Sequence, residues 1–124
     1  MAGVHQYNAG LVWTGNKGLG TANYKAYGRE HTIFIEGKPA IQGSSDTHFR
    51  GDGSKYNPED MLVAALMACH LLSYLHLCAV EGVIVVGYTD KASGIMEETA
   101  NGGGRFTEVT LHPVVLVSDA SMVD

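Results

Sequence analysis

Hydrophobic and polar residues alternate in segments on either side of one long apolar stretch. Residues 5–14 and 20–36 are rich in β-branched and aromatic side chains, and the glycine-containing segment 15–18 between them is typical of a turn. We therefore expect residues 5–36 to form a hairpin. Residues 83–98 and 105–117 repeat the strand pattern around a predicted turn at 101–104. Pro113 has no N–H group to donate, so its strand should lie at an edge or be bulged there.

Between these strands the sequence predicts one helix. Asn57 suits the N-cap, Pro58 suits the first helical position, and two acidic residues follow in the first turn. Met61 to Val80 consists of apolar and aromatic residues and two cysteines, interrupted only by two histidines and a serine. The helix should run to about Val80, with Gly82 stopping it. A helix that is apolar all round is most simply the buried centre of a soluble fold.

Residues 37–56 form a polar segment rich in Gly, Ser and Asp, which reads as a long loop. The order of elements is strands, long helix, strands. It predicts an α+β fold in which antiparallel sheet packs on a central apolar helix, with residues 1–124 as a single domain.

Composition and charge argue against some classes of function. A net charge of −5 with scattered Lys and Arg argues against nucleic acid as the main partner. The N-terminal segment lacks the pattern of a signal peptide, so we expect a cytoplasmic protein with two free thiols. The apolar helix is long enough to span a membrane. Its two histidines and serine are costly in lipid, however, and we expect no membrane partner.

The two cysteines, Cys69 and Cys78, are nine residues apart on the predicted helix. That spacing puts them about half a turn out of phase and ~13 Å apart along the axis. A disulfide needs Cα atoms within ~7 Å, so the two cannot bridge within one chain. His70 and His76 do not form an i, i+4 pair with either thiol, as helical metal ligands would, and we expect no metal and no cofactor.

A buried thiol packs like a small hydrophobe unless a neighbouring cation favours its thiolate. Arg50 and Glu59 lie near the start of the helix. Glu59 precedes Cys69 by ten residues, or ~15 Å along the axis, so the two cannot touch within one chain. In a dimer whose helices cross antiparallel, Glu59 of one protomer would lie beside Cys69 of the other.

The sequence Asn57-Pro58-Glu59, with Ala68-Cys69 ending ten residues after the glutamate, resembles the signature of the OsmC/Ohr family of organic hydroperoxide reductases. The strand–helix–strand order and the opening Trp13-Thr14-Gly15 are also similar, and the resemblance covers nearly the whole chain. It implies an intertwined homodimer with two active sites at the subunit interface.

The resemblance also implies roles for individual residues. Cys69 corresponds to the peroxidatic cysteine and Glu59 to the glutamate that organises the site. The family's arginine matches Arg50 approximately, with a one-residue difference in spacing, and Lys17 is the alternative from the first hairpin turn. The implied activity is thiol-dependent reduction of organic hydroperoxides to alcohols, with an external thiol or dithiol as reductant.

Two features depart from the family pattern. His70 follows the cysteine where many members carry phenylalanine. The family's resolving cysteine lies on a later helix, and Cys78 does not match that position. We therefore expect a C-terminal helix carrying the resolving cysteine, and a final strand, beyond residue 124, because Ser118-Asp119 is typical of a helix cap. The competing hypothesis is a non-catalytic, dimeric module, structural or binding a hydrophobic ligand, in which Cys69 only packs.

Overall fold

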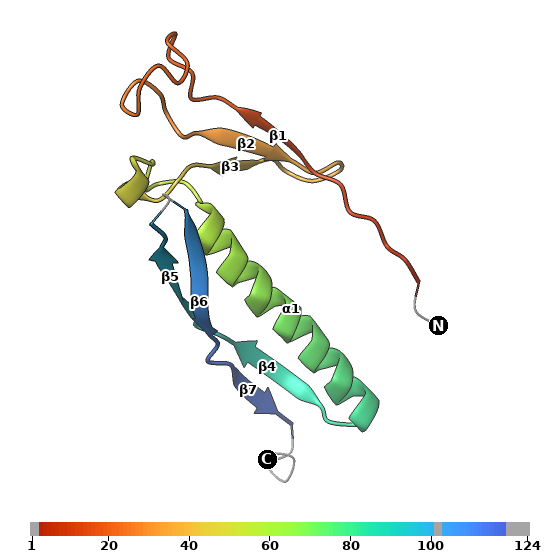
Figure 1. Cartoon of the computed structure of the whole chain (residues 1–124). Coiled ribbons are helices and arrows are strands. Elements are labelled where there is room, and N and C mark those ends of the chain that lie inside the picture. The colour runs from red at the N-terminus through yellow and green to blue at the C-terminus, as the bar shows by residue number, and fades with distance from the viewer. Residues whose placement is uncertain (1–2, 101–102, 119–124) are drawn as a thin grey trace. The chain divides into compact units, whose positions relative to one another are not determined.

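The computed structural model describes residues 3–100 and 103–118, which fall into two compact units. The first unit extends to Pro58 and the second begins at Glu59. Figure 1 shows the elements of both, and each unit is described here by itself.

The first unit is built on a three-stranded antiparallel sheet in the order β1-β2-β3. Its strands are β1 (Gly10–Trp13), β2 (His31–Phe34) and β3 (Ile41–Gly43). The predicted pairing of the first two strands is confirmed, with Leu11 opposite Ile33. The strands are shorter than expected, because residues 20–30 belong to the connection between them and not to a strand.

That connection is closed by aromatic and cationic contacts. The indole Nε1 of Trp13 donates to the carbonyl oxygen of Gly28 at 2.8 Å. The Arg29 guanidinium lies over the rings of Tyr24 and Tyr27, 4.4 and 3.8 Å from their centroids. It also donates to the carbonyl oxygens of both tyrosines. These contacts hold residues 14–30 as one ordered loop, which replaces the short hairpin turn predicted at 15–18.

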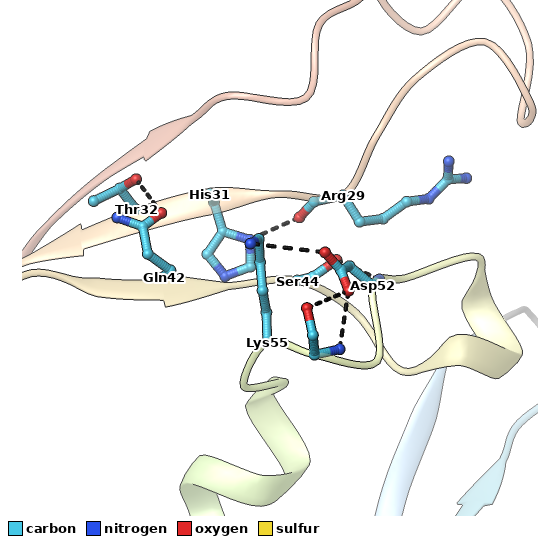
Figure 2. Close-up of polar contacts among 8 residues, drawn as sticks. Arg29, His31, Thr32, Gln42, Ser44, Asp52 and Lys55 are labelled. Atoms are coloured by element: carbon cyan, nitrogen blue, oxygen red, sulfur yellow. Dashed lines mark hydrogen bonds and ion pairs between the residues drawn. The ribbon is translucent and has the colours of Figure 1, made fainter.

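The segment 37–56, predicted as a loop, contains β3 and a short 3₁₀ helix, η1 (Thr47–Phe49). Strand periodicity cannot reveal a strand of three residues, which explains the incorrect prediction. Figure 2 shows the polar contacts that fix this segment. The hydroxyl of Ser44, which is 0% exposed, accepts from the Asp52 backbone N–H at 3.0 Å. Lys55 Nζ lies 3.7 Å from an Asp52 carboxylate oxygen.

The long helix α1 (Pro58–Glu81) belongs to the second unit from Glu59 onward, and its predicted start at Pro58 is confirmed. It ends one residue later than expected, at a Schellman motif around Gly82. Gly82 adopts a φ of 78°, and its N–H donates to the Ala79 carbonyl oxygen. The N–H of Val83 donates to the Cys78 carbonyl oxygen at 2.9 Å.

Two antiparallel ribbons accompany the helix (Figure 1). One pairs β4 (Val85–Thr89) with β7 (Val114–Val117), and the other pairs β5 (Ser93–Glu98) with β6 (Gly104–Thr110). The two long strands predicted are thus each interrupted once. The interruptions face each other, where the His112 N–H donates to an Asp90 carboxylate oxygen at 2.8 Å. Pro113 lies at this interruption, in agreement with the expected irregularity.

Two turn predictions fall partly outside the described residues. Asn101 and Gly102 of the predicted turn 101–104 are outside them, although the Thr99 N–H donates to the Gly103 carbonyl oxygen across that turn. Asp119 of the predicted cap also lies outside them, and Ser118 follows β7 with its N–H donating to the Ile84 carbonyl oxygen.

The expected burial of the helix is not found within the second unit. Cys78 is the only residue of α1 that is buried. By length and composition α1 is also capable of crossing a membrane, a weak indication that core helices of soluble proteins share. The ribbons of the second unit therefore cover one side of the helix and leave a large apolar surface open within that unit.

Candidate functional site

The helix α1 has a covered face and an open face. The covered face is marked by partly or fully buried residues at spacings of three or four, which are Glu59, Val63, Met67, Leu71, Tyr74 and Cys78. The ribbons pack here: a Cβ placed on Gly94 of β5 would lie 3.0 Å from a Val63 methyl group. Tyr88 of β4 contacts Tyr74, with ring centroids 5.9 Å apart.

The open face carries Cys69. Its residues alternate at spacings of three and four, and we call them the open seam: Glu59, Leu62, Leu66, Cys69, Ser73, His76 and Val80. Glu59, at the helix start, borders both faces. The side chains of Leu62 and Val80 are 43% and 66% exposed. A strict alternation of three and four is the spacing with which one helix packs along another.

The two thiols therefore differ in environment. Cys69 is exposed and Cys78 is buried, and both are free. Within the described residues no side-chain partner is found for the thiol of Cys69. The thiol of Cys78 forms a hydrogen bond with the Tyr74 hydroxyl, and this bond is the main cause of the raised pKa of Tyr74. The two cysteines lie on one continuous helix, nine residues apart, which is the geometry from which no pairing within the chain was predicted.

Glu59 lies in the first turn of α1, where its carboxylate complements the positive end of the helix dipole. No ion pair of Glu59 is found among residues 3–100 and 103–118. It is ten residues from Cys69 on one continuous helix, so the structure does not bring the two together within a chain.

Arg50 belongs to the first unit, where it ends the 3₁₀ helix η1. Its backbone is left-handed, with φ 60° and ψ 30°, and within the described residues no other non-glycine residue has positive φ. Strained backbone of this kind is concentrated at functional sites. The side chain is exposed and pairs with no described carboxylate, so the guanidinium is presented to solvent.

The segment around Arg50 is held by its own polar contacts. Asp46 caps η1 by accepting from the His48 backbone N–H at 2.9 Å. That backbone bond, followed by the His48 side-chain bond, lowers the pKa of Asp46. Hydrogen bonds from Ser54 likewise lower the pKa of Asp52. Both carboxylates therefore stay ionised and hold the segment at neutral pH.

Lys17, the alternative cation, lies in the loop between β1 and β2. The Asn16 side-chain oxygen accepts from the N–H groups of Gly18 and Gly20 at 2.9 and 3.0 Å, which forms a local turn around Lys17. Lys17 is exposed and has no described ion-pair partner. The same loop contains Arg29, a cation that was not predicted as a site residue. Its guanidinium lies over the rings of Tyr24 and Tyr27.

His70 is the functional candidate for which the sequence analysis assigned no role. Its Nδ1 lies 2.8 Å from the Tyr88 hydroxyl, and its ring stacks on Tyr74 with centroids 6.1 Å apart. Burial, and secondarily the charge of Asp90, raise the pKa of Tyr88. This cluster forms only where α1 packs against β4, so the sequence alone does not reveal it. No group of residues able to hold a metal ion is found in the described part of the chain.

Two comparisons with known proteins identify the same family. The model of the OsmC-like protein family matches residues 51–123, a range that includes Glu59 and Cys69 and begins just after Arg50. Among solved structures, an OsmC-like protein of unknown function from Vibrio cholerae O1 biovar eltor is similar to this chain at 30% sequence identity. The TM-score is 0.81, and the match covers 98% of this chain and 80% of the other. A search of curated proteins found no match.

Proposed function

The chain belongs to the OsmC-like family, and on that premise we propose that it is a thiol-dependent peroxidase that reduces organic hydroperoxides through Cys69. The family includes hydroperoxide reductases. The observation that carries the proposal is the open seam, which places a thiol on an unpartnered apolar helix face with Glu59 in the same row.

The spacing of the seam supports a dimer with a defined register. If a two-fold axis crosses the helix at residue 64, Glu59 of one protomer faces Cys69 of the other. The same axis places Leu62 opposite the partner's Leu66, so the flanking apolar positions pair as well. One symmetric packing thus buries apolar surface and joins the two polar residues that lie ~15 Å apart within a chain. It forms two equivalent sites.

The chemistry follows from thiolate nucleophilicity. The Cys69 thiolate attacks the terminal oxygen of the hydroperoxide, an S–O bond forms and the O–O bond breaks. The electron pair leaves with the alkoxide, which takes a proton to become the alcohol, and Cys69 becomes a sulfenic acid. Two external thiols, or one dithiol, then reduce the sulfenic acid to the thiol, are themselves oxidised to a disulfide, and water is released.

Arg50 is the proposed cation for the thiolate. A guanidinium favours the thiolate form, and Glu59 would orient it through a bidentate pair. Both side chains are exposed, and the strained backbone of Arg50 supports this assignment over Lys17. Apolar side chains of the open seam would favour substrates with alkyl chains, since small-molecule sites are mostly apolar with few polar groups.

The test is hydroperoxide consumption with dithiothreitol as reductant. We expect cumene hydroperoxide to be consumed by the wild-type protein, and Cys69→Ser to reduce the rate to background. Cys78→Ser is the matched control and should keep the rate within about two-fold, because Cys78 lies on the other face. Equal rates for the wild type and Cys69→Ser would contradict the proposal and favour the non-catalytic module.

A further inference from the structure

The cluster around His70 is the strongest unassigned group of titratable side chains. It joins α1 to β4 within the second unit: His70 Nδ1 lies 2.8 Å from the Tyr88 hydroxyl, and the His70 ring stacks on Tyr74 at an interplanar angle of 13°. Tyr88 also contacts both rings from β4. Two aromatic rings and one hydrogen bond thus fix the orientation of an imidazole that follows Cys69 directly in the chain.

We propose that His70, held by Tyr88, donates the proton that the leaving alkoxide needs when Cys69 reduces an organic hydroperoxide. This inference rests on the proposed function and adds a catalytic residue, His70, and a positioning residue, Tyr88, to it. The group that the pair recognises is the inner oxygen of the substrate, which carries the alkyl group.

Helix geometry favours the substrate over the thiol as the target of His70. Consecutive helix residues are separated by 100° around the axis and 1.5 Å along it, and their side chains do not face each other. His70 is therefore poorly placed to remove the Cys69 proton. A hydroperoxide whose terminal oxygen meets Cys69 extends away from it, and its second oxygen would be the atom within reach of the imidazole.

The hydrogen bond with Tyr88 determines which nitrogen is available. Burial and the charge of Asp90 raise the pKa of Tyr88, so its phenol stays protonated and can donate to Nδ1. In the neutral imidazole Nδ1 is then the acceptor and Nε2 carries the hydrogen. Nε2 has no partner in the described part of the chain, and His70 is exposed. An exposed N–H donor is thereby held on the residue next to Cys69.

The proton balance is complete without a further reactant. Nε2–H gives its proton to the alkoxide as the O–O bond breaks, and the Tyr88 phenol proton passes to Nδ1. Solvent then protonates Nε2 and the Nδ1 proton returns to the tyrosinate, a form that the raised pKa of Tyr88 disfavours, so the starting tautomer is restored. General acid catalysis of this kind typically contributes about 10²–10⁴-fold to a rate.

The experiment compares two oxidants that differ in their leaving group. tert-Butyl hydroperoxide releases an alkoxide that needs a proton, whereas peracetic acid releases acetate, which does not. For His70→Gln we expect the rate of Cys69 oxidation by tert-butyl hydroperoxide to fall about 100-fold. With peracetic acid the rate should stay within about two-fold. Tyr88→Phe should show the same selectivity with a loss of about ten-fold, and Tyr7→Phe, which alters a phenol that is 89% exposed, serves as the control.

A second readout examines the positioning role directly. Nitrogen-15 NMR of the wild-type protein should show His70 as the Nε2–H tautomer, and Tyr88→Phe should give a mixture of tautomers. Equal losses with both oxidants, or no loss with either, would overturn the inference while leaving the peroxidase proposal intact. A wild-type protein that consumes neither oxidant overturns both, and an Nδ1–H tautomer overturns the assigned direction of the proton.

Discussion

Cys69 and Cys78 are the same residue type on the same helix, yet the fold treats them differently. Cys78 lies on the covered face, buried and bonded to the Tyr74 hydroxyl, while Cys69 lies exposed on the open face. Nine residues of helix produce the difference, because they turn a side chain by half a revolution. The comparison shows that the ribbons determine which thiol stays available for chemistry.

The largest expected contrast is in thiol reactivity. Iodoacetamide should alkylate Cys69 in the folded protein about 100-fold faster than Cys78, because Cys78 reacts only when the covered face opens locally. Peptide mapping by mass spectrometry after timed quenching measures both rates in one sample. In urea the two rates should converge. Equal rates in native buffer would show that the two faces are not distinct.

Adjacent leucines give the next contrast. Leu72 is 66% exposed, whereas Leu71 lies on the covered face. Leu72→Asp should weaken the proposed dimer by about 10–100-fold while the fold persists, because it places a carboxylate at the edge of the apolar surface. Leu71→Asp should instead lower the stability of the unit itself.

Light scattering over a concentration series, together with circular dichroism, separates the two effects. A wild-type protein that is monomeric at micromolar concentration would contradict the dimer. A Leu72→Asp protein that loses its helical signal would show that the open face contributes to the fold of a single chain.

Serine replacement should separate the cysteines by stability. Cys78→Ser puts a hydroxyl in a buried, mostly apolar position, and we expect it to lower the free energy of unfolding by about 1–2 kcal/mol. Cys69→Ser should change it by less than about 0.5 kcal/mol, because no described residue of the same chain covers Cys69 and the change conserves volume in the proposed dimer. Urea denaturation at one fixed protein concentration provides both values, and a reversed order would contradict the assignment of faces.

The smallest expected effect is the response of the covered face to alkali. The pKa of Tyr74 is raised mainly by its hydrogen bond with Cys78, and that of Tyr88 mainly by burial. A raised pKa in the folded state means that the stabilising contribution is fully present below the unfolded value of 10.0 and is lost as pH rises through the folded pKa. Stability should therefore decline above pH ~10, and less steeply in Tyr88→Phe. Thermal melts from pH 8 to 11 measure this, and identical slopes would contradict the shift at Tyr88.

Sequence reasoning succeeded where local signals are strong. The cap at Asn57-Pro58 and the glycine at position 82 located both ends of the helix within one residue. The antiparallel pairing of the N-terminal strands and the α+β class were also predicted. Such signals act over a few residues, so the sequence carries them directly.

The missed features depend on contacts between distant residues. Asp90 and His112, which are 22 residues apart, hold the interruption of the C-terminal ribbons. In the sequence, only the neighbouring Pro113 indicated an irregularity there. The His70–Tyr88 contact joins residues 18 apart. The assignments of Cys69, Glu59 and Arg50 stay predictions, because the family match supports the signature and not the role of each side chain.

The left-handed backbone of Arg50 has a consequence for selection in the laboratory. A non-glycine residue in this conformation costs about 1–2 kcal/mol relative to glycine, so Arg50→Gly would relieve strain as it removes the guanidinium. A library sorted for thermal stability should therefore enrich glycine at position 50, whereas a library sorted for peroxide resistance should keep arginine. At position 50, selection for stability and selection for activity would therefore favour different residues.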